Sequence, residues 1–218
     1  MPLPMEVNLD LMSFIETRIL PLYNAFDSSH GLTHVKRVID NAMELARRLG
    51  VDSNMVYTIA AYHDLGMSGP RAIHHLTGGK ILAADRRLSK WFSPEQIKIM
   101  KAAVEDHRAS ASHEPRSIYG KIVAEADRDL MPDVVFTRAV AFGLDRYPEL
   151  DKTRQWERFA RHMEEKYGVN GYLRLWIPNS PNEKYLKTVR EIMSDRLKLQ
   201  QTFEEIYARL QAQKTETT

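Results

Sequence analysis

The sequence contains no cysteine and no long apolar run. Without thiolates, the protein cannot form disulfides or thiolate zinc sites, so any metal must be bound by imidazole and carboxylate groups. Nowhere do about 18 apolar residues follow one another, the length that a membrane-spanning helix needs. The first residues, MPLPMEVNLDLMSF, also lack the basic start and apolar core of a secretion signal. We therefore expect a soluble, cytoplasmic protein that has no membrane association.

An excess of charge of one sign is also missing. The chain has 31 basic and 29 acidic residues, a formal net charge of +2. A balanced charge argues against general attraction to nucleic acid, although it leaves room for a local anion site. We expect no stable complex with nucleic acid.

The pattern of apolar residues predicts an all-α protein. The 218 residues, 43% of them hydrophobic, are enough for one domain with a core. Apolar residues recur every three or four positions, and strand-like alternation is scarce. The predicted helices are Leu9–Asn24, His34–Leu49, Asn54–Leu65, Ile73–Leu88, Pro94–His107, Pro115–Leu130, Pro132–Tyr147, Asp151–Tyr167 and Glu183–Leu210.

Capping residues mark several of these helix ends. Ser93 precedes Pro94, which predicts a helix start, and Asp52 or Ser53 is the expected cap of the helix after Gly50. Gly168 and Gly171 are expected to end another helix. The segment 168–184 has no clear periodicity and is either a connection or a lid. We expect one compact helical bundle: an N-terminal helix in 1–27, a core in 28–150 and a C-terminal helical extension in 151–218.

Histidines occur at inward positions of several predicted helices. His34 lies at the border of an apolar stripe on its helix, whereas His30, next to Gly31 and the capping-type Ser28 and Ser29, is a weaker candidate.

His63 continues the inward stripe of the next helix, and the following carboxylate, Asp64, would need a cation or hydrogen-bond donors if it were buried. His107 falls on the inward face of a third helix, and helical periodicity does not choose among the acids Glu125, Asp127 and Asp129. Each histidine taken alone is more simply explained as a structural residue.

Together these residues resemble the HD-domain metal-dependent phosphohydrolases. The signature of that family is a histidine, a later His-Asp pair and a distant aspartate. His34 in HVKRV matches the first histidine, His63 and Asp64 in AAYHDLG match the pair, and Asp127 in AEADRDL matches the last aspartate. The resemblance spans roughly residues 28–130. It implies an all-α HD bundle in which His34, His63, Asp64 and Asp127 bind one divalent metal ion.

A second resemblance concerns a further histidine. Two-metal members of the family place a histidine four residues before a glycine, as His74 stands before Gly78. Those members often have a His-His pair later, where this chain has Asp106 and His107. Because Asp106 replaces the first histidine of that pair, the resemblance does not establish a second metal ion. The stretch EDHRASASHEPRSIYGKIV is similar to bacterial small nucleotide pyrophosphohydrolases.

The resemblance implies hydrolysis of a phosphate or pyrophosphate bond by metal-activated water, with a small phosphorylated substrate, most simply a nucleotide. Mixed nitrogen and oxygen ligands fit Mn, Fe, Co, Ni or Zn better than Mg, although Mg is also a candidate for the divalent ion. The expected catalytic residues are Asp64, His74 and His107. Cations near the motif supply the expected substrate-binding residues: Arg108, Lys121 and Arg128, with Lys80 as a further option. Lys36, Arg37, Arg86 and Arg87 are more simply solvated charges.

Two other functions are compatible with the same scaffold. An HD-type di-iron oxygenase would need a complete second set of ligands, against which the Asp106-His107 departure counts. A non-catalytic regulatory HD module would have lost ligands, whereas all four signature residues are present. The sequence does not predict the oligomeric state.

Overall fold

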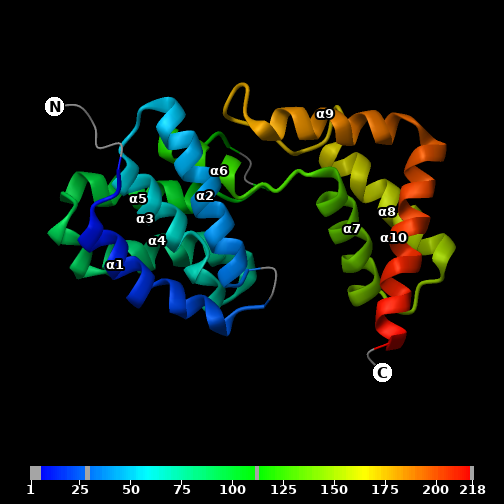
Figure 1. Ribbon diagram of the computed structural model, residues 1–218, viewed down its shortest axis with the longest axis horizontal. Helices are drawn as coiled ribbons and strands as arrows, with labels where there is room; N and C mark the ends of the chain where they lie inside the picture. The colour runs from blue at the N-terminus through cyan, green and yellow to red at the C-terminus, as the bar shows by residue number, and fades with distance from the viewer. Residues whose placement is uncertain (1–5, 28–29, 111–112, 217–218) are drawn as a thin grey trace. The chain divides into compact units, whose positions relative to one another are not determined.

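The computed structural model of the protein describes residues 6–27, 30–110 and 113–216. Two stretches mentioned above, residues 1–5 of the N-terminal segment and the capping-type Ser28 and Ser29, lie outside the described residues. Within them the chain forms helices and connecting turns and no strand, as the sequence predicted (Figure 1). None of these helices is both long enough and apolar enough to cross a membrane.

The chain divides into two compact units, Met1–Arg128 and Asp129–Thr218. The first unit contains α1 (Leu9–Arg18), η1 (Leu20–Ala25), α2 (Leu32–Leu49), α3 (Ser53–Tyr62), η2 (Leu65–Ser68), η3 (Arg71–Ile73), α4 (His74–Ala84), η4 (Arg86–Lys90), α5 (Pro94–Asp106) and α6 (Ile118–Ala126), where η marks a 3-10 helix. The second contains α7 (Pro132–Arg146), α8 (Lys152–Tyr167), α9 (Pro181–Ser194) and α10 (Arg196–Glu216). The sequence predicted one compact bundle with an extension from residue 151, whereas in the structure α7 already groups with α8, α9 and α10.

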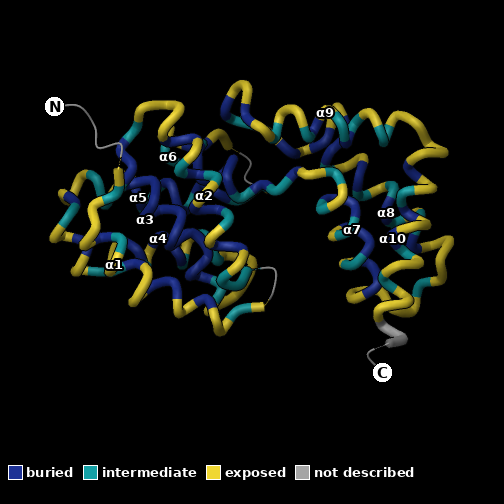
Figure 2. The backbone as a smooth tube through the Cα atoms, in the orientation of Figure 1, coloured by how far each residue is buried: buried dark blue, intermediate teal, exposed yellow. Residues whose placement is uncertain are grey.

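Helix α3 forms the centre of the first unit. It contacts α1, α2, α4, α5 and α6, and it is buried along almost its whole length (Figure 2). The neighbouring helix α2 turns its predicted stripe inward, because Val35, Val38 and Ala42 are almost fully buried. Burying such faces is the main favourable contribution to a helical bundle.

Side-chain caps fix several helix ends that the sequence predicted. The Asp52 carboxylate accepts the N–H groups of Asn54 and Met55 at the start of α3. Ser93 and Gln96 form a reciprocal capping box at the start of α5, and Gly168 ends α8.

Two segments that the apolar periodicity predicts as single helices are each interrupted by one residue. The segment Ile73–Leu88 is broken at Asp85, and Glu183–Leu210 is broken at Asp195. Both aspartates have extended ψ values, 91° and 101°, and their carboxylates accept N–H groups of the following turn. An aspartate can therefore end one helix and cap the next without glycine or proline.

Gly66 permits the close approach of η2 to α4. A Cβ atom at Gly66 would lie 1.9 Å from the carbonyl oxygen of His74 and 2.6 Å from the amide nitrogen of Gly78. Gly78 in turn lies close to His63, since a Cβ there would be 3.0 Å from the His63 carbonyl oxygen. Gly66 and Gly78 thus permit close backbone contacts between η2, α4 and the end of α3.

Gly66→Ala should strongly destabilise the first unit, because the added methyl group meets backbone atoms that cannot rotate away. We expect a loss of at least about 2 kcal/mol in the free energy of unfolding, measured by urea denaturation. Gly69→Ala is the matched control, since its Cβ would lie 3.7 Å from the nearest atom, an ordinary contact. Equal stability of the two variants would show that η2 does not need this close approach.

Candidate metal centre

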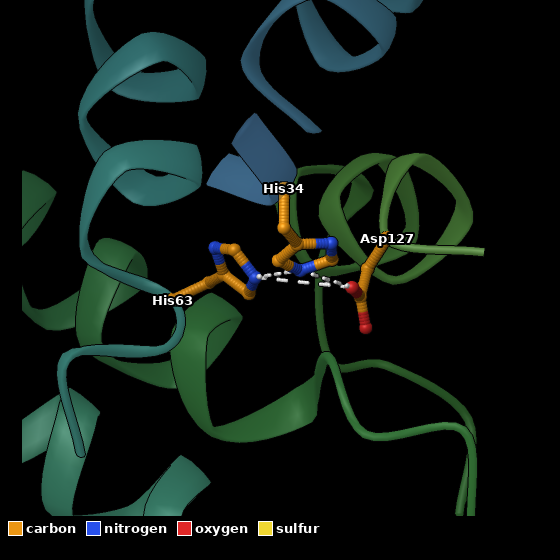
Figure 3. A group of neighbouring side chains, drawn as sticks. All are labelled: His34, His63 and Asp127. Carbon is orange, nitrogen blue, oxygen red and sulfur yellow. Dashed lines mark hydrogen bonds and ion pairs between the residues drawn. The ribbon is translucent and has the colours of Figure 1, made fainter. Parts of the chain in front are cut away.

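Four side chains from three separate parts of the first unit bring their polar ends together. His34 lies in the first turn of α2, His63 and Asp64 directly follow α3, and Asp127 directly follows α6. His34 Nε2 is 3.3 Å from His63 Nε2 and 3.2 Å from Asp127 Oδ1, and Figure 3 shows these three side chains pointing toward one another. The Asp64 carboxylate completes the set, with Oδ2 3.5 Å from His34 Nε2 and 3.3 Å from His63 Nε2.

The other oxygen of Asp64 faces a second group of donors. Asp64 Oδ1 lies 3.5 Å from Nε2 of both His74 and His107, and these two nitrogens are 3.1 Å apart. Asp64 therefore joins two groups, His34–His63–Asp127 and Asp64–His74–His107, each with a spacing that could hold a metal ion.

Three of the imidazoles are oriented by backbone carbonyls. Nδ1 of His63 lies 2.7 Å from the Ala60 oxygen, Nδ1 of His74 2.8 Å from the Arg71 oxygen, and Nδ1 of His107 2.6 Å from the Val104 oxygen. A carbonyl can only accept, so each Nδ1 carries its proton, and in the neutral ring the Nε2 lone pair is free. All three free lone pairs belong to atoms that face Asp64 or His34. This is the tautomer that a metal ligand needs.

Helix ends bring these residues together. His63, His107 and Asp127 are the C-terminal caps of α3, α5 and α6. The sequence placed His63 and Asp64 inside a helix extending to Leu65, but α3 ends at Tyr62. The C-terminal end of a helix carries a partial negative charge, which favours a cation nearby. Three such ends converge at the centre.

The charges of the first group are strongly coupled. Burial alone would lower the pKa of His34, but hydrogen bonds to Asp127 and Asp64 raise it to about 9. Burial would likewise lower the pKa of His63, and the charge of Asp64 raises it. Burial would raise the pKa of both carboxyls, but the charge of His63 and hydrogen bonds from histidines hold the pKa of Asp64 far below its usual value, and the His34 hydrogen bond does the same for Asp127. The carboxylates are therefore ionised and attract positive charge.

The donor set fits a divalent transition-metal ion. Nitrogen and carboxylate ligands stand about 2.0–2.2 Å from Zn²⁺, so neighbouring ligands of one tetrahedral ion are about 3.3–3.6 Å apart. Among the ligand atoms of His34, His63, Asp64 and Asp127, the five distances that involve an imidazole nitrogen range from 3.2 to 3.8 Å. Two imidazole nitrogens and two carboxylate oxygens, without sulfur, suit several first-row metals.

Asp106, the residue that departs from the His-His pair, points away from both groups. Its buried carboxylate accepts the backbone N–H of Arg116 at 2.8 Å and the Arg116 guanidinium Nε at 3.0 Å. Arg116 also donates to the Glu105 carboxylate at 2.9 Å. Asp106 thus ties the chain after α5 to the start of α6, while the adjacent His107 reaches the centre.

The residues expected to bind substrate make protein contacts that occupy part of their hydrogen-bonding capacity. Arg108 donates to the Ala72 carbonyl at 2.8 Å, Lys121 pairs with Glu114, and buried Arg128 donates to the Ala124 carbonyl. The weaker candidate His30 lies 3.0 Å from the Asp27 carboxylate through Nδ1, on the exposed side.

Arg37 has a contact that the sequence did not indicate. It was assigned to the solvated charges, yet its Nη2 lies 3.5 Å from His34 Nδ1 and the residue is half-buried. The only available signal was its position three residues after His34, which places both side chains on one face of α2.

Comparison with known families identifies the first unit. Residues 31–131 match the family model of the HD domain, a range that contains both donor groups. Residues 31–131 of the chain therefore correspond to an HD domain. The resemblance to the HD-domain family that the sequence predicted is confirmed over this range.

Two solved structures are similar to this HD protein. YpgQ of Bacillus subtilis, solved in complex with ADP, shares 19% identity with a TM-score of 0.57, and the match covers 90% of this chain and 95% of YpgQ. A predicted HD superfamily hydrolase from an uncultured Thermotogales bacterium shares 22% identity with a TM-score of 0.48, covering 71% of this chain and 86% of that one. The likeness to YpgQ shows a shared fold. None of the curated proteins compared with the sequence matches it.

Metal binding should depend on pH, because a proton and a metal ion compete for His34 Nε2. With the pKa of His34 raised to about 9, the imidazole is protonated at neutral pH unless an ion displaces the proton. The affinity for Mn²⁺, measured by calorimetry on chelator-treated protein, should rise about tenfold per pH unit for each proton released. The rise should level off above about pH 9. An affinity that does not change between pH 6.5 and 9 would contradict this ionic coupling.

Proposed function

We propose that this HD protein is a divalent-metal-dependent phosphohydrolase that cleaves a phosphate or pyrophosphate bond of a nucleotide. The observation that carries the proposal is the convergence of His34, His63, Asp64 and Asp127 at ligand distances, with a second pair of imidazoles on the far oxygen of Asp64. Such a site has donors for an ion and further groups left for water and substrate.

His34, His63, Asp64 and Asp127 would hold one ion. An ion there would polarise a phosphoryl oxygen and lower the pKa of a bound water molecule. With one carboxylate oxygen in the metal group, Asp64 also keeps a second oxygen on the side of His74 and His107.

His74 and His107 are proposed to handle the proton of the attacking water. Burial lowers the pKa of His74, which keeps this imidazole neutral near pH 7 and able to accept a proton at Nε2. Both Nε2 atoms face the same Asp64 oxygen. A water molecule between these groups would be within reach of three acceptors.

A nucleotide substrate is supported by two observations. The structurally similar YpgQ was solved with ADP, and basic groups lie close to the centre in this chain. Arg37 lies beside His34, and Arg108 follows His107 directly. Arg108, Lys121 and Arg128 would contact phosphate through the N–H groups that they do not use in the protein.

The reaction is tested by a hydrolysis screen. Nucleoside mono-, di- and triphosphates, cyclic dinucleotides and sugar phosphates are incubated with Mn²⁺, Co²⁺, Ni²⁺, Zn²⁺ or Mg²⁺, and phosphate and pyrophosphate are measured separately. We expect metal-dependent turnover of a nucleotide. Oxygen consumption with two bound irons would favour an oxygenase, and a lack of both metal and turnover would favour a regulatory module.

Asp64→Ala should abolish that turnover while leaving the far-UV circular dichroism almost unchanged, because Asp64 lies beyond the end of α3. Asp40→Ala, which removes an exposed carboxylate from α2, is the matched control and should retain activity. Undiminished turnover in Asp64→Ala would remove this carboxylate from the mechanism.

His107→Ala separates the proposed one-ion site from a two-ion site. Loss of a general acid–base group should lower turnover by about 10²–10⁴-fold. Metal content, measured by mass spectrometry, should stay at one ion per chain in the variant and the wild type. Two ions in the wild type and one in the variant would instead assign His74 and His107 as ligands of a second ion. His162→Ala, in the second unit, is the control.

A further inference from the structure

The end of α3 is completed by a tyrosine from the N-terminal segment. The Tyr23 hydroxyl donates to the Ala61 carbonyl at 2.9 Å and accepts the backbone N–H of Asp64 at 3.3 Å. Tyr23 lies in η1 and is fully buried. One hydroxyl thus connects the last turn of α3 to the backbone of Asp64.

These two hydrogen bonds take the place of helical ones. If α3 continued, the Asp64 N–H would bond to the Ala60 carbonyl, four residues earlier. Instead, the Ala60 carbonyl accepts from His63 Nδ1, and the Asp64 N–H turns to Tyr23. The Asp64 backbone has φ −105° and ψ 6°, outside the regular helical region. Tyr23 and His63 therefore satisfy the groups that the helix leaves unpaired where it ends.

The position of this turn matters because Asp64 touches both donor groups. Its Oδ2 lies 3.3 Å from His63 Nε2, and its Oδ1 lies 3.5 Å from His107 Nε2. A small rotation of the Asp64 backbone would move both oxygens at once. The amide that defines this rotation is the one bonded to Tyr23.

We propose that Tyr23 is a positioning residue for Asp64, acting through the hydrogen bond from the Asp64 amide to its hydroxyl. The HD match begins at residue 31, so the N-terminal segment supplies the metal centre with a support from outside the matched region. This role rests on the metal-dependent function proposed above. The hydrogen bond between Tyr23 and the Asp64 amide can nevertheless be measured without a substrate.

Tyr23→Phe tests this role, because it keeps the ring that packs on Phe26 at a centroid distance of 5.4 Å and removes only the hydroxyl. Tyr62→Phe is the matched control. Tyr62 is equally buried, lies on α3 and donates its hydroxyl to the Asp85 carboxylate at 2.7 Å, away from the donor groups. Both variants lose one buried hydrogen-bonding hydroxyl, but only Tyr23→Phe affects the Asp64 amide.

The full-length variants are compared by Mn²⁺ affinity and by hydrogen exchange of the Asp64 amide. Tyr23→Phe should lower Mn²⁺ affinity about tenfold or more, the usual effect of losing a group that orients a ligand, and should speed exchange at Asp64. For an active substrate, kcat should fall more than KM rises. Tyr62→Phe should change Mn²⁺ affinity less than about twofold, even if both variants melt at lower temperature.

Unchanged Mn²⁺ affinity and unchanged Asp64 exchange in Tyr23→Phe would overturn the role of Tyr23. A wild-type protein that binds no Mn²⁺ would instead contradict the proposed function, and the exchange measurement would still decide the role of Tyr23. If Tyr23→Phe does not fold, 3-fluorotyrosine at position 23 keeps the shape of the side chain while making its hydroxyl a weaker hydrogen-bond acceptor. Hydrogen exchange of the Asp64 amide should then become faster. Slower or unchanged exchange would count against the proposal.

Discussion

The hydrogen bond from an imidazole Nδ1 to a carbonyl three residues earlier recurs at His63, His74 and His107. The Ala60 and Val104 carbonyls belong to the last turns of α3 and α5, where helical N–H partners are missing, whereas the Arg71 carbonyl also accepts the backbone N–H of His74. The histidine completes the helix end with one nitrogen and presents the other to the centre. The same contact therefore stabilises the fold and selects the tautomer that can bind a metal ion. Moving any of these helix ends by a residue would separate the two roles.

Opposite charges complete this arrangement. Burial opposes ionisation of Asp64 and Asp127, yet the neighbouring histidines lower the pKa of both carboxyls. A buried ion pair is costly unless its members have further hydrogen bonds, and here each polar group has several partners. A cation that binds here would replace protons within a set of charges that is already organised.

Much of this organisation could be predicted from the sequence. The apolar stripe of α2 placed His34 at the edge of the core, and the family signature brought His63, Asp64 and Asp127 into one set before any distance was known. The sequence predicts Ser93 as a cap and offers Asp52 or Ser53 for the next helix, because short polar side chains before an apolar run have few other roles; the structure selects Asp52. Periodicity extended α3 past Tyr62, because it reports which face is buried and not where the hydrogen bonding stops.

Other features depend on contacts between distant parts of the chain. Asp106 binds Arg116 across a loop, and Tyr23 reaches Asp64 from another helix, so no local pattern indicates either contact. Asp85 and Asp195 resemble ordinary surface acids until their extended backbone is known. Periodicity could not choose Asp127 over Glu125 and Asp129, because Asp127 lies just beyond the end of α6, where the helical pattern no longer applies.

The proposed ligands are spread along the first unit, from His34 at the start of α2 to Asp127 next to the unit's last residue. No short peptide excised from this chain contains the whole set, and a fragment that stops after α5 lacks the final carboxylate. During synthesis, the set of four residues would therefore be complete only after α6 has emerged and packed against the earlier helices. An ion held by all four residues would accordingly bind only to a first unit that has fully assembled.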